Sequence, residues 1–458
     1  MEKRGYSVNS EALSIIEMCD NWYKNVEDEK FHRRKNLNGK ELHLSRMNFA
    51  KRCCSDDANL CEIISVAPEK ESASQDFIDS ILKNNRFAVQ YRKQLEKTSA
   101  SGTAGAYVYL KGATYVKGPK DTVKVKDGVI KLNYCEADSI IPLTVENDLV
   151  TECAFCGTDR VKGNVQTTLV IFTLENDNYK AETVIFDDKG IVKEESEIQL
   201  GNVKPFAILT NAEVNNLENM EGYGIPKIYN AIPMLKAVDL CYNILYGDLD
   251  KGEKIVFLNE MLAEVQKNED GSYKLTPQQK ELFVLLGDKL PNEKTLIQEY
   301  NPEIRVEDIT KAFELVLSLL SMSFGYGSKK YTFENGKITT ATEYIGSKQD
   351  SMQELNKQRA NAKDYITDII HAAMWFSNQF HKTSFNVEEE LSIEFDDSYI
   401  VDKETKLETM RSDAVTFSEV PVLLVWYLME RYNLSEEDAR KHIAEGSGSE
   451  DDNDDLND

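Results

Sequence analysis

Hydrophobic and polar positions follow two different periodicities along the first half of this chain. Residues 10–30 and 73–98 carry apolar side chains at helical spacing, which predicts amphipathic helices. From Ala106 to Ile198 the pattern changes to short runs rich in β-branched and aromatic residues, separated by Asp-Gly, Asn-Asp and Lys-Gly pairs. Short runs of this composition with turn residues between them predict an antiparallel sheet.

Helical periodicity returns after Gly222-Tyr223-Gly224. One helix is predicted from Pro226 to Gly252, because proline suits the first turn of a helix. A second helix is predicted from Arg305 to Met322, and residues 253–304 form a mixed insertion between the two. The second helix is apolar on more than one face, which indicates burial on several sides.

The remaining third of the chain predicts mostly helices. A long helix is expected from Ala341 to about Gln379, with Gly346 as its weakest point. Residues 385–395 alternate like a strand, residues 420–432 are helical, and a short last helix follows Ser435. The pattern therefore predicts an α+β protein of more than one domain.

Composition and charge narrow the class of protein. Of 458 residues, 41% are hydrophobic and 29% charged, and no apolar run is long enough to span a membrane. No secretory signal follows Met1, so we expect a cytoplasmic site of synthesis, with the eight cysteines present as thiols. The segment Glu445–Asp458 holds seven acids and no base, and a disordered tail is predicted from residue 446 onward.

The net charge of -25 bears directly on nucleic-acid binding. Ordinary nucleic-acid binders present a basic face to phosphates and release counterions. A chain this acidic does not fit that description. If DNA is a partner, we expect it to pass the protein rather than to be gripped by it.

Motifs for catalysis or metal binding are weak. Cys153-Ala154-Phe155-Cys156 has the spacing of half a zinc site, but no second pair matches it and the run alternates like a strand. Neither glycine-rich segment, at 222–227 or 325–330, completes a phosphate-binding loop. Acid pairs such as Asp396-Asp397 are too common at this composition to nominate a catalytic dyad. We predict no enzyme activity, no metal and no cofactor.

The segment from Gly325 to Thr342 is more informative. It combines two glycines, an aromatic pair and the basic residues Lys329, Lys330 and Lys337, and it lies between two long apolar helices. One interpretation is a connection between helices with solvated lysines. The other is a loop that presents these lysines to a polyanion.

The same segment resembles the most characteristic part of the portal proteins of long-tailed phages of Gram-positive bacteria. The similar residues are Leu320-Ser321-Met322-Ser323-Phe324-Gly325-Tyr326-Gly327, then Tyr331-Thr332-Phe333 and Thr339-Thr340-Ala341-Thr342-Glu343. Further pieces follow in the same order as in that family: Trp22-Tyr23, Met47-Asn48-Phe49-Ala50-Lys51, Ala58-Asn59-Leu60, Asn85-Arg86-Phe87, Gly102-Thr103-Ala104-Gly105-Ala106, Glu136-Ala137-Asp138, Ile141-Pro142-Leu143, Glu152-Cys153-Ala154-Phe155, Gly222-Tyr223-Gly224, Asp239, Phe395-Asp396-Asp397-Ser398 and Tyr432-Asn433-Leu434-Ser435-Glu436-Glu437-Asp438-Ala439. The chain departs from the family pattern at Tyr344 and at Ile225-Pro226.

The resemblance implies a ring-forming α+β portal fold with a defined order of parts. They are an N-terminal wing of helices and antiparallel sheet (1–222), a stem helix (223–252), a clip (253–304), a second stem helix (305–324), a tunnel loop (325–340), a long kinked helix (341–384), a C-terminal wing strand with crown helices (385–445) and a disordered acidic tail (446–458). The wide apolar surface of the second stem helix would then be covered by neighbouring subunits.

The resemblance also implies functional residues and partners. Lys329, Lys330 and Lys337 would face DNA from the tunnel loop, Asp239 would belong to the stem, and the family motif around the loop comprises Phe324, Gly325, Gly327, Thr340, Ala341, Thr342 and Glu343. The implied partners are copies of the chain in a dodecameric ring, double-stranded DNA, the terminase large subunit, a head-completion or adaptor protein, scaffold and major capsid protein, with no membrane. The location would be the portal vertex of the virion, after assembly in the host cytoplasm.

Two hypotheses from different classes remain. The first is a portal protein, a conduit for DNA packaging and ejection that docks terminase and head-tail connector proteins. The second is a metal-dependent DNA-processing enzyme of a phage or mobile element. The absence of a nucleotide motif and of a compact cluster of acids and histidines favours the first.

Overall fold

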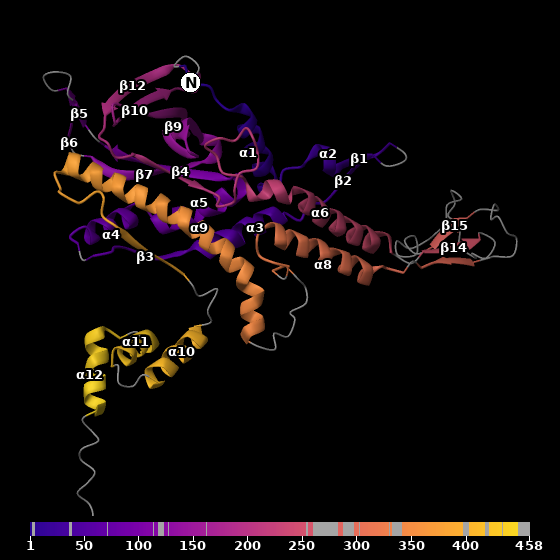
Figure 1. Ribbon diagram of the computed structural model, residues 1–458. Coiled ribbons are helices and arrows are strands. Elements are labelled where there is room, and N and C mark those ends of the chain that lie inside the picture. Colours follow the sequence, from indigo (N-terminus) through magenta and orange to yellow (C-terminus); the bar gives the residue numbers. More distant parts are fainter. Residues whose placement is uncertain are drawn as a thin grey trace, which may run out of the picture.

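The chain folds into a body of sheets and helices from which a two-helix arm projects (Figure 1). The computed structural model describes residues 1, 5–35, 39–70, 72–112, 114–117, 123–126, 128–161, 163–252, 255–259, 283–286, 297–301, 303–328, 330–331, 341–396, 403–416, 421–432 and 434–447. Helices and antiparallel sheets are mixed along the chain, as the periodicity predicts. Among the helices of the described part, none is long and apolar enough to cross a bilayer.

A five-stranded antiparallel sheet forms one layer of the body. Its order is β12-β11-β10-β9-β8, and the strands are β8 (Ile140–Glu146), β9 (Leu149–Val161), β10 (Asn164–Glu175), β11 (Asn178–Phe186) and β12 (Val192–Gln199). Two hairpins turn at Asn147-Asp148 and at Asn176-Asp177, where all four residues have a positive φ. Asparagine and aspartate tolerate this backbone, so these short pairs fix the register of the strands.

A second sheet lies between the first and the helices of the body (Figure 1). It has the order β13-β4-β7, from β4 (Thr103–Lys111), β7 (Val129–Glu136) and β13 (Phe206–Thr210). Aromatic rings join the two sheets. Phe155 packs against Tyr107 at 5.1 Å and against Phe206 at 5.7 Å between ring centroids, and all three are buried. These contacts form the centre of the core.

Helices α5 (Phe87–Ser101) and α9 (Ala341–Phe376) contact the second sheet. They approach each other through Gln94, which donates to the carbonyls of Gly105 at 2.7 Å and Cys135 at 3.2 Å and pairs with the Tyr365 hydroxyl. The side chain of Gln94 is buried, so these bonds satisfy polar groups that water cannot reach.

The predicted helix of residues 73–98 is wrong in its continuity. The structure has two helices, α4 (Gln75–Asn84) and α5, and Arg86 between them has a φ of 51°. The turn is held by Asn85, which donates to the Ile81 carbonyl at 2.9 Å and accepts from the Leu132 amide at 3.0 Å. This tie to β7 forces the break, and periodicity alone does not reveal it.

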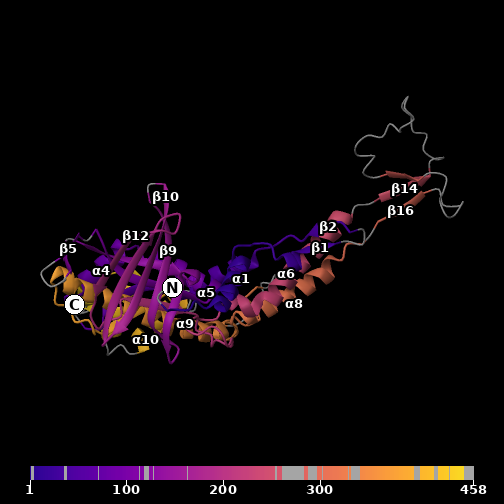
Figure 2. The same ribbon diagram turned by 90° about the horizontal axis from the view of Figure 1, so that it is seen from above.

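The arm consists of α6 (Lys227–Lys251) and α8 (Val306–Ser323), which pack against each other. A small sheet of β14 (Ile255–Asn259), β15 (Phe283–Leu286) and β16 (Ile297–Tyr300) lies at its far end in both views (Figures 1 and 2). Arg305 at the start of α8 donates two bonds, at 3.0 and 2.9 Å, to Asp248 of α6. The insertion between the helices thus projects from the end of the helix pair.

The N-terminal elements, from residue 10 to residue 61, form a layer that packs against the arm. It consists of α1 (Ser10–Tyr23), α2 (Glu29–His32), the hairpin β1 (Arg33–Lys35) and β2 (Glu41–His43), α3 (Phe49–Ala58) and the single turn Asn59–Cys61. Shorter elements are β3 (Ile63–Pro68), the hairpin β5 (Thr114–Lys117) with β6 (Val123–Lys126), and the turn Ala137–Ser139.

The C-terminal part contains a strand and three helices. Helix α9 is bent in Figure 1 and ends in a π-helical turn at Ser377–His381. β17 (Leu391–Phe395) then pairs with β3, and α10 (Lys403–Thr416), α11 (Pro421–Tyr432) and α12 (Glu436–Ser447) follow. The sequence missed α10, and α12 runs two residues into the predicted tail. The tail from residue 448 lies outside the described residues.

Candidate functional site

The loop that follows α8 begins with a helix stop built on glycine. Gly325 has a φ of 77°, the Gly325 amide donates to the Met322 carbonyl, and the Tyr326 amide donates to the Ser321 carbonyl, each at 3.0 Å. This pair of bonds is the Schellman motif, which requires a left-handed residue after the helix. A Cβ on Gly325 would also lie 3.0 Å from the Glu354 side chain. The positive φ therefore favours glycine here, and a Cβ would in addition press on the Glu354 side chain.

The residues after this stop turn back into the body. Tyr326 is buried, stacks on Phe324 at 6.2 Å between ring centroids, and donates from its hydroxyl to Asp57 at 2.9 Å. Tyr331 packs edge-on against Phe49 of α3 at 5.2 Å. We call residues 324–331 the loop root. Its aromatic side chains fasten the start of the loop to α3.

A buried lysine lies directly beneath the loop root. The Nζ of Lys227, at the first turn of α6, is 2.8 Å from Asp57 of α3 and 2.9 Å from Glu354 of α9. The Lys227 side chain has no exposed surface, and both carboxylates are at most one-tenth exposed. The four side chains of Lys227, Asp57, Glu354 and Tyr326, which we call the buried ionic cluster, join the arm, the N-terminal layer, the long helix and the loop.

Electrostatics within the cluster favour a charged lysine. Burial by itself lowers the pKa of Lys227, but the carboxylates of Asp57 and Glu354 outweigh it and hold that pKa above its usual value. Burial, and next to it the charge of Asp57, raises the pKa of Tyr326, so its hydroxyl stays protonated and remains a donor. Because such a pair is costly to bury, its geometry fixes the relative positions of the elements more than it adds net stability.

Glu213 adds a third carboxylate near this cluster and yields a pH-dependent prediction. Burial, and then the nearby charges of Glu354 and Asp57, raise its pKa, while Lys227 acts in the opposite direction. A raised pKa in the folded state means that the protonated form stabilises the fold, and this stability is lost as pH rises through that pKa. We therefore expect Glu213→Gln to raise the melting temperature near pH 7.5 and to change it less near pH 4.5. Equal shifts at both pH values in thermal melts would contradict this.

Asp239, predicted as a stem residue, lies buried on α6. It accepts the Met47 amide at 2.8 Å, and its second oxygen lies 3.1 Å from Nε2 of the buried His32. The Nδ1 atom of His32 accepts the Asp28 amide at 3.0 Å, so Nε2 carries the proton and donates to Asp239. Asp239 thus ties the base of the arm to the segment around α2.

The predicted loop lysines are only partly described. Lys330 lies at the loop root, with its Nζ 5.6 Å from the centre of the Tyr326 ring, and its amide donates to the Ser321 hydroxyl at 3.3 Å. Lys329, Lys337 and Thr340 lie outside the described residues. Ala341, Thr342 and Glu343 form the first turn of α9. Phe324 and Gly325 belong to the helix stop, and Gly327 has a φ of 70° in the loop root.

Two pieces of the quoted resemblance meet at the start of α6. A Cβ on Gly102, whose φ is 83°, would lie 2.0 Å from the Gly224 carbonyl oxygen. The Gly224 amide donates to the Thr103 hydroxyl at 2.9 Å, and the Asn211 side chain donates to the Ile225 carbonyl at 3.0 Å. This crossing of two backbones places Lys227 at its position in the buried ionic cluster.

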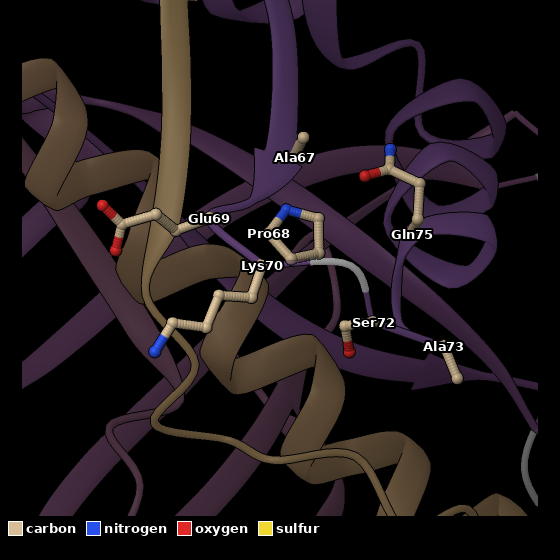
Figure 3. Close-up of a pocket in the computed structure, with 7 residues that line it drawn as sticks. All are labelled: Ala67, Pro68, Glu69, Lys70, Ser72, Ala73 and Gln75. Carbon is tan, nitrogen blue, oxygen red and sulfur yellow. The ribbon is translucent and has the colours of Figure 1, made fainter.

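A pocket beside the turn between β3 and α4 offers no comparable chemistry (Figure 3). Its seven lining residues all come from one short stretch, 67–75. Glu69 and Lys70 point away from Gln75, whose amide is engaged by the Val66 carbonyl and by Asp79. No set of side chains converges there, so we assign this pocket no ligand.

Metal ligands do not gather in the part of the chain that is described. Within it, no group of three or more His, Cys, Asp or Glu side chains is arranged to hold an ion. Cys153 is fully buried in β9, where burial holds the pKa of its thiol well above the usual value, and Cys156 is half-buried in the same strand. A thiol with a raised pKa is a poor metal ligand, because metals bind the thiolate.

Comparison with known proteins gives likenesses to solved structures alone. No protein-family model and no curated protein sequence matches the chain. Among solved structures, the chain is similar to one described as the neck of a native GTA particle computed with C12 symmetry. The two are 10% identical, the match covers 79% of this chain and 85% of the other, and the TM-score is 0.38.

Proposed function

We propose that this chain is the portal protein of a tailed bacteriophage, a ring-forming conduit for packaging and ejection of double-stranded DNA. The observation that carries the proposal is the arm. α6 and α8 project together with a small sheet at their far end, and the loop with the resembling motif leaves the base of the same arm. This order of parts is the one that the sequence resemblance implies for stem, clip and tunnel loop.

The proposal assigns a role to each part. α6 and α8 form the stem, residues 253–304 the clip, residues 325–340 the tunnel loop, and α10 to α12 belong to the crown. The body with its two sheets is the wing. Copies of the chain close into a dodecameric ring at the capsid vertex, and the partners are terminase, a head-completion or adaptor protein, scaffold and major capsid protein.

Particle mass and shape test this function. Multi-angle light scattering of the purified chain should give the mass of a large cyclic oligomer, and negative-stain micrographs should show rings with a central hole. A metal-dependent DNA-processing enzyme has no need of such a ring. A monomer or dimer at all concentrations, together with divalent-metal-dependent cleavage of DNA, would overturn the proposal.

The clip assignment gives a separate prediction. Replacing residues 256–300 with a short linker removes the sheet at the end of the arm but leaves both helices. We expect ring formation to persist at least in part and binding of the terminase large subunit to be lost in a pull-down. Terminase binding at the level of the unaltered chain would contradict the assignment of residues 253–304 as the clip.

The three loop lysines give a further prediction. A ring that carries a net charge of -25 on each copy repels a duplex, which bears one negative charge per about 1.7 Å. Lys329, Lys330 and Lys337 would add weak attraction at the loop, to centre or slow the DNA. Changing all three to Gln should leave assembly intact and alter packaging rate or DNA retention, more so at low salt. Lys330→Gln alone is the control for the contact with Tyr326. Unaltered packaging at every salt concentration would show that the loop acts by shape.

A further inference from the structure

The two sides of the arm carry opposite charge. In both views the β1–β2 hairpin lies on one side of α6, and α8 lies on the other (Figures 1 and 2). The segment Lys30–Arg46 holds six basic residues and one acid, and the three acids just before it, Glu27, Asp28 and Glu29, pair within the chain with Arg33, His43 and Lys236. Helix α8 holds three acids and one lysine. The arm therefore has a basic side and an acidic side.

The basic side is held firmly on α6. The Ser45 amide donates to Asn243 at 2.8 Å, and Asn243 donates back to the Ser45 carbonyl at 2.7 Å. Together with the bonds that Asp239 makes to Met47 and His32, these fix the segment before and after the hairpin. The strands themselves are exposed at every residue, with Leu42 46% exposed among the bases.

The acidic side has an uncovered apolar stripe. Leu315, Leu319 and Met322 are 62%, 47% and 57% exposed and follow one another at helical spacing along α8. The opposite face of α8 is buried through Ile309, Phe313, Leu317 and Leu320. Glu307 and Asp308 extend the exposed surface toward the far end of the arm. A helix that is apolar on two faces is expected to pack against a neighbour on each of them.

We propose that the hairpin side of one copy docks on the outer face of α8 of the next copy. The occupant of each surface is thus a second copy of this chain, and the inference rests on the proposed ring. Complementary patches on opposite sides of one molecule make a head-to-tail contact, and head-to-tail contacts repeat until they close into a ring. Neither patch is complementary to itself, so a two-fold dimer through either one would set like charges together.

A second copy fits these surfaces better than DNA does. DNA would match the arginines and lysines of the hairpin, but it would leave the leucines of α8 uncovered and would meet a strongly acidic molecule. A neighbouring copy covers the apolar stripe and also offsets the repulsion between chains that each carry -25. The hairpin supplies both the bases and an exposed leucine for that purpose.

A charge swap tests the contact on the full chain. Arg34→Glu with Lys35→Glu reverses the hairpin and spares Arg33, which pairs with Glu27 and Glu29 within its own chain. We expect the protein concentration at half assembly, measured by light scattering, to rise on the order of tenfold or more. Glu307→Lys with Asp308→Lys on α8 should weaken assembly similarly. The four changes together should restore assembly, because the charges again oppose each other.

The control is Lys189→Glu with Lys193→Glu, which makes the same charge change at two exposed positions near the turn between β11 and β12. This variant should assemble like the unaltered chain. If the hairpin variant and the α8 variant each weaken assembly but the combined variant does not recover it, the two surfaces do not face each other. The inference then fails while the proposed function stands. If the hairpin variant assembles normally and instead loses DNA in retention assays, the basic side meets DNA. An unaltered chain that never forms rings overturns the proposed function and this inference with it.

Discussion

Gly102→Ala is expected to destabilise the chain more than alanine at any other glycine in the part of the chain that the structure describes. The new Cβ would lie 2.0 Å from the Gly224 carbonyl oxygen and 2.9 Å from the Ile225 backbone, and both are parts of a crossing that cannot yield locally. Residue 102 also has a φ of 83°, which costs an alanine about 1–2 kcal/mol by itself. Adding the displaced backbone, we expect a loss of about 4 kcal/mol or more in the free energy of unfolding.

Gly190→Ala provides the matched control for this prediction. Gly190 has a φ of 73°, and a Cβ there meets nothing within 4 Å. Its substitution carries the backbone strain without the steric clash, so we expect a loss of about 1–2 kcal/mol. Urea-induced unfolding followed by circular dichroism at fixed protein concentration gives both values. Losses of equal size would mean that the crossing of Gly102 and Gly224 is not rigid.

Much of the fold could be predicted from the sequence, because turn residues and helical periodicity depend only on residues close together in the chain. The hairpin pairs Asn147-Asp148 and Asn176-Asp177 require a positive φ that these residues tolerate, so the turns could be predicted before the strands were seen. The arm was predictable for a related reason. Apolar residues at helical spacing continue through almost all of α6 and α8, and the segment between them lacks that spacing.

Tertiary contacts explain what the sequence missed. The break between α4 and α5 depends on Asn85 bonding to Leu132 of a distant strand. Helix α10 has acidic and basic residues all round and little apolar periodicity, so its pattern resembles that of a loop. The loop motif drew attention to lysines, whereas the side chains that anchor the loop root are Tyr326, which donates to Asp57, and Tyr331, which packs on Phe49.

One feature of the sequence could have predicted the buried ionic cluster. Lys227 shares a helix face with Ala231, Leu235 and Val238, which are all buried. A lysine at a core position of an amphipathic helix requires a partner, because an unpaired buried charge is very costly. The sequence does not show which acids pair with Lys227, because Asp57 and Glu354 lie on separate helices that are both far from Lys227 in the sequence.

Loss of the buried lysine should therefore be nearly as costly as the glycine change. Lys227→Met keeps most of the length of the side chain, leaves Asp57 buried without a cation and leaves Glu354 with only the exposed Lys357, 3.6 Å away. We expect a loss of about 3–5 kcal/mol in the free energy of unfolding. The control is Lys236→Met on the same helix, where the lysine is one-third exposed and pairs with Asp28 at 3.0 Å. That pair should contribute about 1 kcal/mol or less.

Rescue separates a charge effect from a packing effect. Adding Glu354→Gln and Asp57→Asn to Lys227→Met removes the uncompensated carboxylates, so the triple variant should be more stable than Lys227→Met alone. Because Tyr326 donates to Asp57, the same series should also change the loop root, and limited proteolysis after α8 should become faster in Lys227→Met and slower again in the triple variant. If Lys227→Met and Lys236→Met lose equal stability, or the triple variant is the least stable of all, the cluster does not position the loop through its charges.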